Sequence, residues 1–455
     1  MLERRLFSSI QIDYLKINLI EYLKYYFERN LFMQSFHYVD GRLFAEDVEI
    51  KRLSQVIGTP FYCYSSSLIE SQFMAFSDAV KSIGAEVCYS VKANSNLAVI
   101  ATLAKLGAGA DVVSLGELKR ALVAGIPAKK IIFSGVGKTA EELKAAVHAG
   151  IKQINVESEA ELKLLSDIAI LEGSVTNAAI RVNPDIDAET HEKITTGKSD
   201  NKFGIDFVHA QDLFSRMPEF PGVNIDGIAV HIGSQLTSLE PFRRSYERVV
   251  DFVRSLRSDG FNIENLDLGG GLGVRYFSES PPDMEAYIKM VQGVTNGLNC
   301  QITFEPGRVI VGDAGILVSK VIYVKQGSER VFCVVDAAMN DLIRPTLYDA
   351  YHNILMVERP QREMQLTMDV VGPICESGDY FAKGRKLPAL VEGDLIAICT
   401  VGAYGAVMSS SYNSRPIVPE VMVKNNEFSI IRERVSIDEL MRFEKLPSWA
   451  NKKNI

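Results

Sequence analysis

The sequence predicts an α/β protein that combines a (β/α)8 TIM-type barrel with a C-terminal all-β domain. From about residue 86 to residue 310, short apolar runs alternate with longer segments of helical period. After residue 310 the helical period fades and β-rich runs take over. At 455 residues the chain is also too long for one barrel, so a second domain is expected.

Eight apolar or β-branched runs make up the predicted barrel, and amphipathic segments separate them. Strands are expected at 87–91, 110–113, 131–133, 153–156, 179–182, 227–230, 265–268 and 301–304. Helices are expected between them, for example at 114–124, 140–149, 158–171 and 241–258. A doubly wound open sheet has the same alternation. Polar motifs follow strands at both ends of the series, and only closure would bring those motifs together, which favours the barrel.

The all-β domain is predicted from the later runs and from a segment ahead of the barrel. Its strands are expected at 316–324, 331–335, 366–371, 395–400 and 417–423, with 36–58 as a segment that pairs with them. We therefore expect four segments, namely an extension at 1–32, a joining segment at 33–60, the barrel at 61–310 and the β domain at 311–455. The extension is either poorly ordered or a misread start, with Met33 as the true beginning, because acidic residues interrupt any targeting pattern.

Composition narrows the class of partner. The net charge of −8 argues against nucleic acid. No apolar run reaches membrane-spanning length, so no membrane partner is expected. The six cysteines lack close metal-ligand spacing, which predicts no metal site and indicates reduced thiols of a cytoplasmic protein.

Lys92 follows the first predicted barrel strand, in the motif Tyr-Ser-Val-Lys-Ala-Asn at 89–94. In a barrel of parallel strands, the carboxyl ends of the strands converge on one mouth. Desolvation beside buried sequence would lower the pKa of the lysine amine and make it a usable nucleophile. A lysine that simply emerges from a strand into water is the alternative, and the motif alone does not decide between them.

A glycine-rich turn at 269–273 follows the seventh predicted strand. Backbone N–H groups without side chains in the way can cradle a phosphate, although a tight turn needs glycine as well. Its position favours the phosphate, because barrel phosphate sites are built from the loops after strands seven and eight. The loop after strand eight contributes Glu-Pro-Gly-Arg at 305–308.

Glu305 and His231 complete the set of candidates at strand ends. A buried carboxylate needs a cationic or N–H partner, which a protonated pyridine nitrogen would supply and which Arg181 could supply instead. His231 could stack on an aromatic ring, act as a base or be a core histidine. A lysine, a phosphate cradle, a flat histidine and a carboxylate for a ring nitrogen together predict pyridoxal 5′-phosphate (PLP).

The motifs resemble those of a known family. Tyr-Ser-Val-Lys-Ala-Asn, His-Ile-Gly-Ser-Gln, Leu-Gly-Gly-Gly-Leu-Gly-Val, Glu-Pro-Gly-Arg and Cys-Glu-Ser-Gly-Asp at 375–379 are similar to those of the fold-type III PLP-dependent decarboxylases, and among them the bacterial diaminopimelate decarboxylases. The similarity runs from about residue 36 to residue 447 and includes the order and spacing of every motif. It implies decarboxylation of meso-2,6-diaminoheptanedioate (diaminopimelate) to L-lysine and CO2, the last step of lysine biosynthesis.

The resemblance also implies a role for each matching residue. For the cofactor, it implies Lys92 as the lysine that carries PLP, His231 as the ring-stacking residue and Glu305 as the partner of the ring nitrogen. Further cofactor contacts are implied for Asp111, Ser234, Gly269, Gly270, Gly271, Gly307, Arg308 and Tyr404. For the substrate, it implies Arg308, Arg344, Tyr348, Glu376 and Tyr404, with Cys375 as the catalytic proton donor.

Charge would then set the substrate. The distal end of diaminopimelate carries a carboxylate and an ammonium. Arg344 and Arg308 together can bind the carboxylate, and Glu376 can bind the ammonium. Lysine and ornithine, as substrates, lack the distal carboxylate, and a polar site can reject such analogues by a factor on the order of 10⁴. A surface ion pair between Arg344 and Asp341 is the alternative.

Three other functions share these motifs. An ornithine, arginine or carboxynorspermidine decarboxylase would use the same barrel and cofactor, and so would a racemase. A non-catalytic PLP-binding protein is a further alternative, although such proteins are bare barrels. The resemblance also implies a homodimer in which Cys375 and Glu376 of one subunit reach the barrel mouth of the other.

Overall fold

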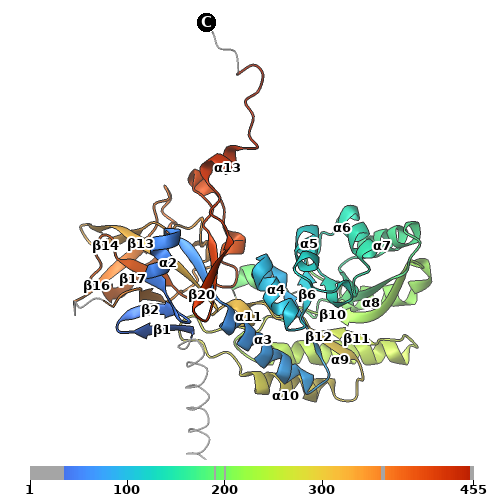
Figure 1. The fold of residues 1–455 in the computed structure, drawn as a ribbon. Helices are drawn as coiled ribbons and strands as arrows, with labels where there is room; N and C mark the ends of the chain where they lie inside the picture. Colours follow the sequence, from blue (N-terminus) through green and yellow to red (C-terminus); the bar gives the residue numbers. More distant parts are fainter. Residues whose placement is uncertain (1–34, 189–190, 199–200, 360–363, 451–455) are drawn as a thin grey trace, which may run out of the picture.

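The computed structural model describes residues 35–450 except 189–190, 199–200 and 360–363. The predicted extension at 1–32 and the alternative start at Met33 lie outside the described residues. The described chain forms a helix-wrapped barrel beside a β-rich domain (Figure 1). A barrel with a separate sheet domain is the predicted fold class, which is thereby confirmed.

Eight parallel strands close the barrel in the order β10-β11-β12-β5-β6-β7-β8-β9. Their bounds are β5 Glu86–Ser90, β6 Gly109–Val112, β7 Ile131–Phe133, β8 Gln153–Val156, β9 Thr176–Arg181, β10 Val223–Ala229, β11 Asn265–Asp267 and β12 Gln301–Phe304. Closure is made by β12 and β5, where Thr303 pairs with Glu86 and Phe304 with Val87. An open doubly wound sheet is therefore excluded, and the first and last barrel strands lie side by side.

Helices cover the outside of the barrel between successive strands (Figure 1). They are α3 Ser66–Lys81, α4 Leu97–Lys105, α5 Leu115–Val123, α6 Ala140–Ala149, α7 Glu159–Leu171, α8 Phe207–Ser215, α9 Glu240–Ser258 and α10 Met284–Thr295. Helix α6 illustrates why the sequence fixes their ends. Thr139 and Glu142 form a reciprocal capping box at its start, and Gly150 ends it in the left-handed conformation that favours glycine.

The β domain is built around a nine-stranded sheet. Its strands are β4 Phe61–Ser65, β13 Gly315–Gln326, β14 Val331–Val335, β15 Ile354–Met356, β16 Gln365–Val371, β17 Tyr380–Pro388, β18 Leu395–Ile398, β19 Glu420–Lys424 and β20 Glu427–Arg432. Short helices α11 Arg308–Val311, α12 Arg344–Tyr348 and α13 Ile437–Met441 lie along this half of the chain.

The segment ahead of the barrel joins the β domain in two ways. Strands β1 Phe36–Val39, β2 Arg42–Ala45 and β3 Val48–Glu49 form a small sheet, followed by α2 Ile50–Ile57, and Leu43 N–H donates to Val357 O over 2.8 Å. Strand β4 lies between β13 and β19 in the large sheet, although the predicted boundary at residue 61 assigns it to the barrel. All five of its residues are buried, so no alternation marked its place.

The two domains are joined directly behind Lys92. Asn94 Nδ2 donates to Gly402 O over 3.1 Å, Tyr404 N–H donates to Ala93 O over 2.8 Å, and Asn96 Nδ2 donates to a Glu420 carboxylate oxygen over 2.9 Å. The loop that carries Lys92 is thus fixed by both domains. No helix within the described residues is long and apolar enough to cross a membrane.

Candidate functional site

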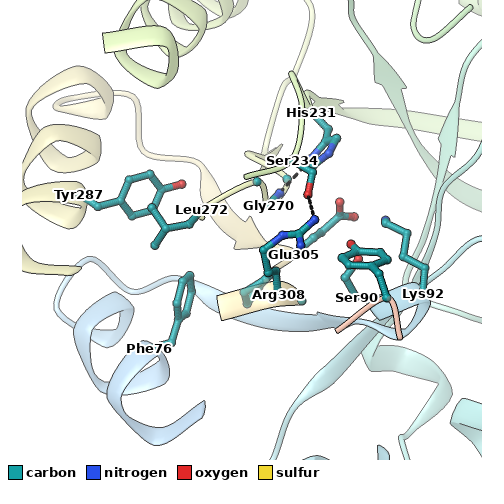
Figure 2. A pocket seen from close by; sticks show the side chains of 15 residues that line it. Phe76, Ser90, Lys92, His231, Ser234, Gly270, Leu272, Tyr287, Glu305 and Arg308 are labelled. Atoms are coloured by element: carbon teal, nitrogen blue, oxygen red, sulfur yellow. Dashed lines mark hydrogen bonds between the residues drawn. The ribbon is translucent and has the colours of Figure 1, made fainter. Parts of the chain in front are cut away.

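A cavity lies at the carboxyl ends of β5, β10, β11 and β12 (Figure 2). Lys92, His231 and Glu305 point toward one side of it, with Phe76 and Tyr287 on the other. Its lining comprises Phe76, Ser90, Lys92, His231, Ser234, Gly269, Gly270, Gly271, Leu272, Tyr287, Glu305, Pro306, Gly307, Arg308 and Tyr404. The barrel thus brings most of the predicted cofactor residues together, while their individual roles stay predictions.

Lys92 lies in a single 3-10 turn, Val91–Ala93, that follows β5. Its Nζ donates to Asp111 Oδ2 over 2.7 Å, and the same oxygen accepts from Ser90 Oγ at 2.7 Å. Burial alone would lower the pKa of Lys92, but the charges of Asp111 and Glu305 outweigh it and raise the pKa above its ordinary value. The expectation of a lowered pKa is therefore wrong, because it considered desolvation without the carboxylates that strand closure brings to the amine.

Glu305 directly follows β12 and lies beside Asp267, the last residue of β11. The two carboxyl groups share a hydrogen bond, and Asn155 Nδ2 donates to Asp267 over 2.8 Å. Burial raises the pKa of Glu305 well above its usual range, and the nearby charges of Asp111 and Asp267 raise it further. Arg181, the alternative partner, pairs with Glu157 at 2.8 Å instead. The Glu305 carboxyl, which lines the cavity, is therefore easier to protonate than an ordinary glutamate.

His231 follows β10, and its Nδ1 accepts from Gly270 N–H over 3.2 Å. Burial lowers the pKa of the imidazole well below its ordinary value, and the charges of Lys92 and Arg181 lower it further. The ring is therefore neutral. The glycine turn lies tightly against the next strand, since a Cβ at Gly270 would be 2.2 Å from Glu305 O. This turn presents backbone without side chains to the cavity.

Arg308 begins α11 and lines the same cavity as Lys92 (Figure 2). Its Nη2 donates to Ser234 Oγ over 2.9 Å and its Nη1 to Tyr276 Oη over 2.6 Å. The guanidinium also lies 4.7 Å from the centre of the Tyr404 ring, and its Nε has no hydrogen-bond partner among the described residues. A buried cation with a free donor is suited to an anionic ligand.

Arg344 is buried at the start of α12, 5% exposed, and its guanidinium lies 4.5 Å from the centre of the Tyr276 ring. The alternative of a surface ion pair with Asp341 is wrong. Asp341 is itself buried, and accepts instead from Ala338 N–H and Asn340 Nδ2. Tyr348, at the end of the same helix, packs edge-on against His191 at 5.7 Å between ring centres.

Cys375 and Glu376 do not line the cavity of their own chain. Both are exposed on a loop of the β domain, where Cys375 N–H donates to Asn413 Oδ1 over 3.0 Å and Tyr412 hydrogen-bonds to Glu376. All six cysteines are unpaired, and Cys375 is the exposed one. The predicted proton donor and the predicted ammonium ligand are thus separated from the predicted cofactor residues within one chain.

Several residues at the site escaped the sequence analysis. Asp267 gave a usable signal, since it is an acidic residue inside an apolar strand. Ser90, Tyr276 and His352 gave none, because their positions depend on contacts between segments far apart in sequence. Tyr276, for example, lies in the loop after β11. It contacts both Arg308, at the start of α11, and Arg344, in the β domain.

The residues at this site fit PLP chemically. The chain offers an amine, a side-chain-free turn with an adjacent hydroxyl and guanidinium for a phosphate, a neutral imidazole, and an acid for a ring nitrogen. Asp111 Oδ1 and Arg308 Nε are buried polar atoms without partners among the described residues, which is consistent with a polar ligand at this site. Lys92, Ser234, Glu305 and the turn at 269–271 would hold it.

Comparisons with known proteins point in the same direction. The pyridoxal-binding domain of the pyridoxal-dependent decarboxylases matches residues 66–312. The diaminopimelate decarboxylase of Zymomonas mobilis is 47% identical over 92% of this chain and 100% of its own. The crystal structure of the Helicobacter pylori diaminopimelate decarboxylase complexed with L-lysine superposes with a TM-score of 0.84, at 41% identity over 87% of this chain and 98% of that one. The corresponding M. jannaschii enzyme with L-lysine gives 0.87, at 36% identity over 91% and 99%.

Proposed function

The chain belongs to the diaminopimelate decarboxylases, and from this membership we propose that Lys92, Glu305 and the 269–271 turn form one part of its active site, which Cys375 and Glu376 of a second copy complete. The enzyme is a PLP-dependent carboxy-lyase that converts meso-diaminopimelate to L-lysine and CO2. The observation that carries the assignment of residues is the convergence of Lys92, Glu305 and the glycine turn on one cavity at neighbouring strand ends.

When bound, PLP supplies an electron sink conjugated to the substrate amine. Lys92 would carry it, with Asp111, 2.7 Å from Nζ, as the carboxylate that holds the amine in place. Glu305 can share a proton with a ring nitrogen, because burial and neighbouring carboxylates raise its pKa. His231 offers a neutral ring face, and Ser234 with the turn offers hydrogen-bond donors for a phosphate.

Arg344 and Arg308 would bind the distal carboxylate of the substrate. Both guanidiniums lie against the same Tyr276 ring, at 4.5 and 5.8 Å from its centre. Among the described residues, neither is within ion-pair distance of a carboxylate, so a buried positive charge is available to a ligand. This supports a substrate with a second carboxylate over ornithine or arginine, the substrates of the alternative decarboxylases, which have only one.

A homodimer with shared sites supplies the missing groups. The exposure of Cys375 and Glu376, together with their absence from the cavity lining of their own chain, supports their action on a neighbouring subunit. The Cys375 thiol would then return a proton to the carbon that has lost CO2. A cytoplasmic location is proposed as well, since this chemistry requires a reduced thiol.

Two measurements test the proposal. Purified protein with PLP should release CO2 and L-lysine from meso-diaminopimelate, and borohydride should fix the cofactor on the peptide that contains Lys92. Turnover with the label on another lysine would contradict the assignment of Lys92, whereas no release of CO2 would contradict the activity itself.

A further inference from the structure

Among the described residues, His352 is the one side chain that hydrogen-bonds to Arg344. The Nη1 atom of Arg344 lies 2.9 Å from Nε2 of His352, and Nε of Arg344 has no partner among the described residues. The chain reverses just after α12, where Asp349 adopts the left-handed conformation and Ala350 N–H donates to Arg344 O over 3.4 Å. This reversal returns His352 to the guanidinium eight residues earlier.

The second ring nitrogen of His352 determines its tautomer. Nδ1 lies 2.8 Å from Cys399 O, and a carbonyl oxygen can only accept. Nδ1 therefore carries the hydrogen, which leaves the Nε2 lone pair to accept from Arg344. His352 is 0% exposed, and burial together with the charge of Arg344 lowers its pKa to about 3, so the ring stays neutral.

A neutral acceptor orients a guanidinium without discharging it. A carboxylate in the place of His352 would form an ion pair with Arg344 and compete with any anionic ligand. The aromatic ring of Tyr276 adds a second contact without formal charge, and it also lies edge-on to His352 at 5.3 Å between ring centres. Arg344 is thus fixed on two sides while its full positive charge remains available.

We propose that His352 is a positioning residue that aims Arg344 at the carboxylate which the substrate retains, and so contributes to selection for a dicarboxylate. This rests on the proposed function, in which Arg344 binds the distal carboxylate. The reaction removes one of the two carboxylates of diaminopimelate, so the product L-lysine keeps the one bound by Arg344. Cadaverine, the diamine of the same length, has none and is the matched ligand.

Two substitutions separate the two ends of the imidazole. In His352→Gln the side-chain oxygen can take the position of Nε2 and accept from Arg344. In His352→Asn the side-chain nitrogen can take the position of Nδ1 and donate to Cys399 O, but nothing reaches Arg344. His148→Leu, on the exposed face of α6, is the control for loss of an imidazole without these contacts.

Binding of L-lysine and cadaverine to each holoenzyme is measured by calorimetry, after the cofactor absorbance and the melting temperature are matched. His352→Asn should weaken L-lysine binding by about tenfold, the size expected for a lost hydrogen bond to a charged group, and leave cadaverine binding within about threefold. His352→Gln should retain most of the preference for L-lysine. For diaminopimelate, the change should appear chiefly in KM rather than kcat.

The outcomes separate the two proposals. Wild-type enzyme that releases no CO2 from diaminopimelate, or prefers cadaverine to L-lysine, overturns the proposed function. Wild-type enzyme that passes both tests, with equal losses for the two ligands in His352→Asn, overturns the role of His352. If the preference for L-lysine over cadaverine falls more in His352→Gln than in His352→Asn, the role of His352 is also overturned. That result would assign the effect to the contact with Cys399 O.

Discussion

The barrel mouth and the 374–379 loop of the β domain carry the two parts of the proposed site. They differ in burial and in whether their residues line the cavity of their own chain. Glu305 and Asp111 are 7% and 0% exposed and face the Lys92 amine within one chain. Cys375 is exposed, on a loop that its own cavity does not include. The proposed cofactor part is therefore assembled within one chain, whereas the proposed proton-donating part would need a second copy of the chain.

The exposed loop is nonetheless well ordered by hydrogen bonds. Asp379, 4% exposed, accepts from Met339 N–H over 2.7 Å and from Ile374 N–H over 2.6 Å. Thr346 Oγ1 donates to Gly378 O over 2.6 Å, which links the loop to the helix that begins with Arg344. One β-domain region thus directs Arg344 inward to its own barrel and Cys375 outward, and we expect the two residues to serve different sites of a dimer.

Replacing Lys92 should have the largest effect, because it removes the residue that we propose carries the cofactor. Lys92→Ala should lose activity to near background, and borohydride should no longer fix PLP on the protein. Lys119→Ala, an exposed lysine on α5, is the control and should keep both properties. A cofactor spectrum unchanged by Lys92→Ala would mean that another residue carries PLP.

Cys375→Ala tests the loop part by itself. A positioned proton donor contributes about 10²- to 10⁴-fold to a rate, so kcat should fall by that factor. PLP absorbance should be unchanged, since Cys375 lies outside the cavity of its own chain. Cys300→Ala, at a half-buried thiol beside Arg257, is the matched control. Full turnover in Cys375→Ala would remove the thiol from the mechanism.

Arg344→Ala tests the inward-facing residue of the same region. Hydrogen bonds to charged groups contribute about 1.5 to 3 kcal/mol, so kcat/KM for diaminopimelate should fall by about ten- to hundredfold. Turnover of lysine or ornithine, which as substrates lack the distal carboxylate, should change little. Equal losses for all three substrates would mean that Arg344 supports the fold or the cofactor rather than specificity.

Sequence patterns predicted the architecture well because period and strand count report on backbone structure. All eight barrel strands fall within a few residues of their predicted positions, and closure follows from them. The pattern failed at β4, a short fully buried strand that pairs with segments more than 200 residues away. It also failed on the pKa of Lys92, because the carboxylates that raise it come from β6 and from the residue after β12. His352 could not be found, since only the chain reversal after α12 makes it a partner of Arg344.

Mixing subunits tests directly whether the two parts lie on different chains. Lys92→Ala and Cys375→Ala proteins are each expected to be inactive, but a heterodimer would carry one intact site of two. Random exchange at equal amounts makes half of the dimers mixed, so about a quarter of wild-type activity should return. The absence of recovery, despite exchange shown with tagged subunits, would assign Cys375 and Lys92 to one chain.

The smallest expected effect concerns the electrostatics within the barrel part. Asp111 is the leading contributor that raises the pKa of Lys92 against burial, and an ammonium cannot act as a nucleophile. In Asp111→Asn that charge is gone while burial remains, so the pKa of Lys92 should fall. More of the amine is then unprotonated at a given pH, and the rate at which apoenzyme takes up PLP should reach its maximum at lower pH than in the wild type. Stopped-flow absorbance across a pH series measures this, with Asp206→Asn on the surface as the control. A maximum at higher pH than in the wild type would contradict this. It would mean that Asp111 acts chiefly as a base that accepts the amine proton, rather than by raising the Lys92 pKa.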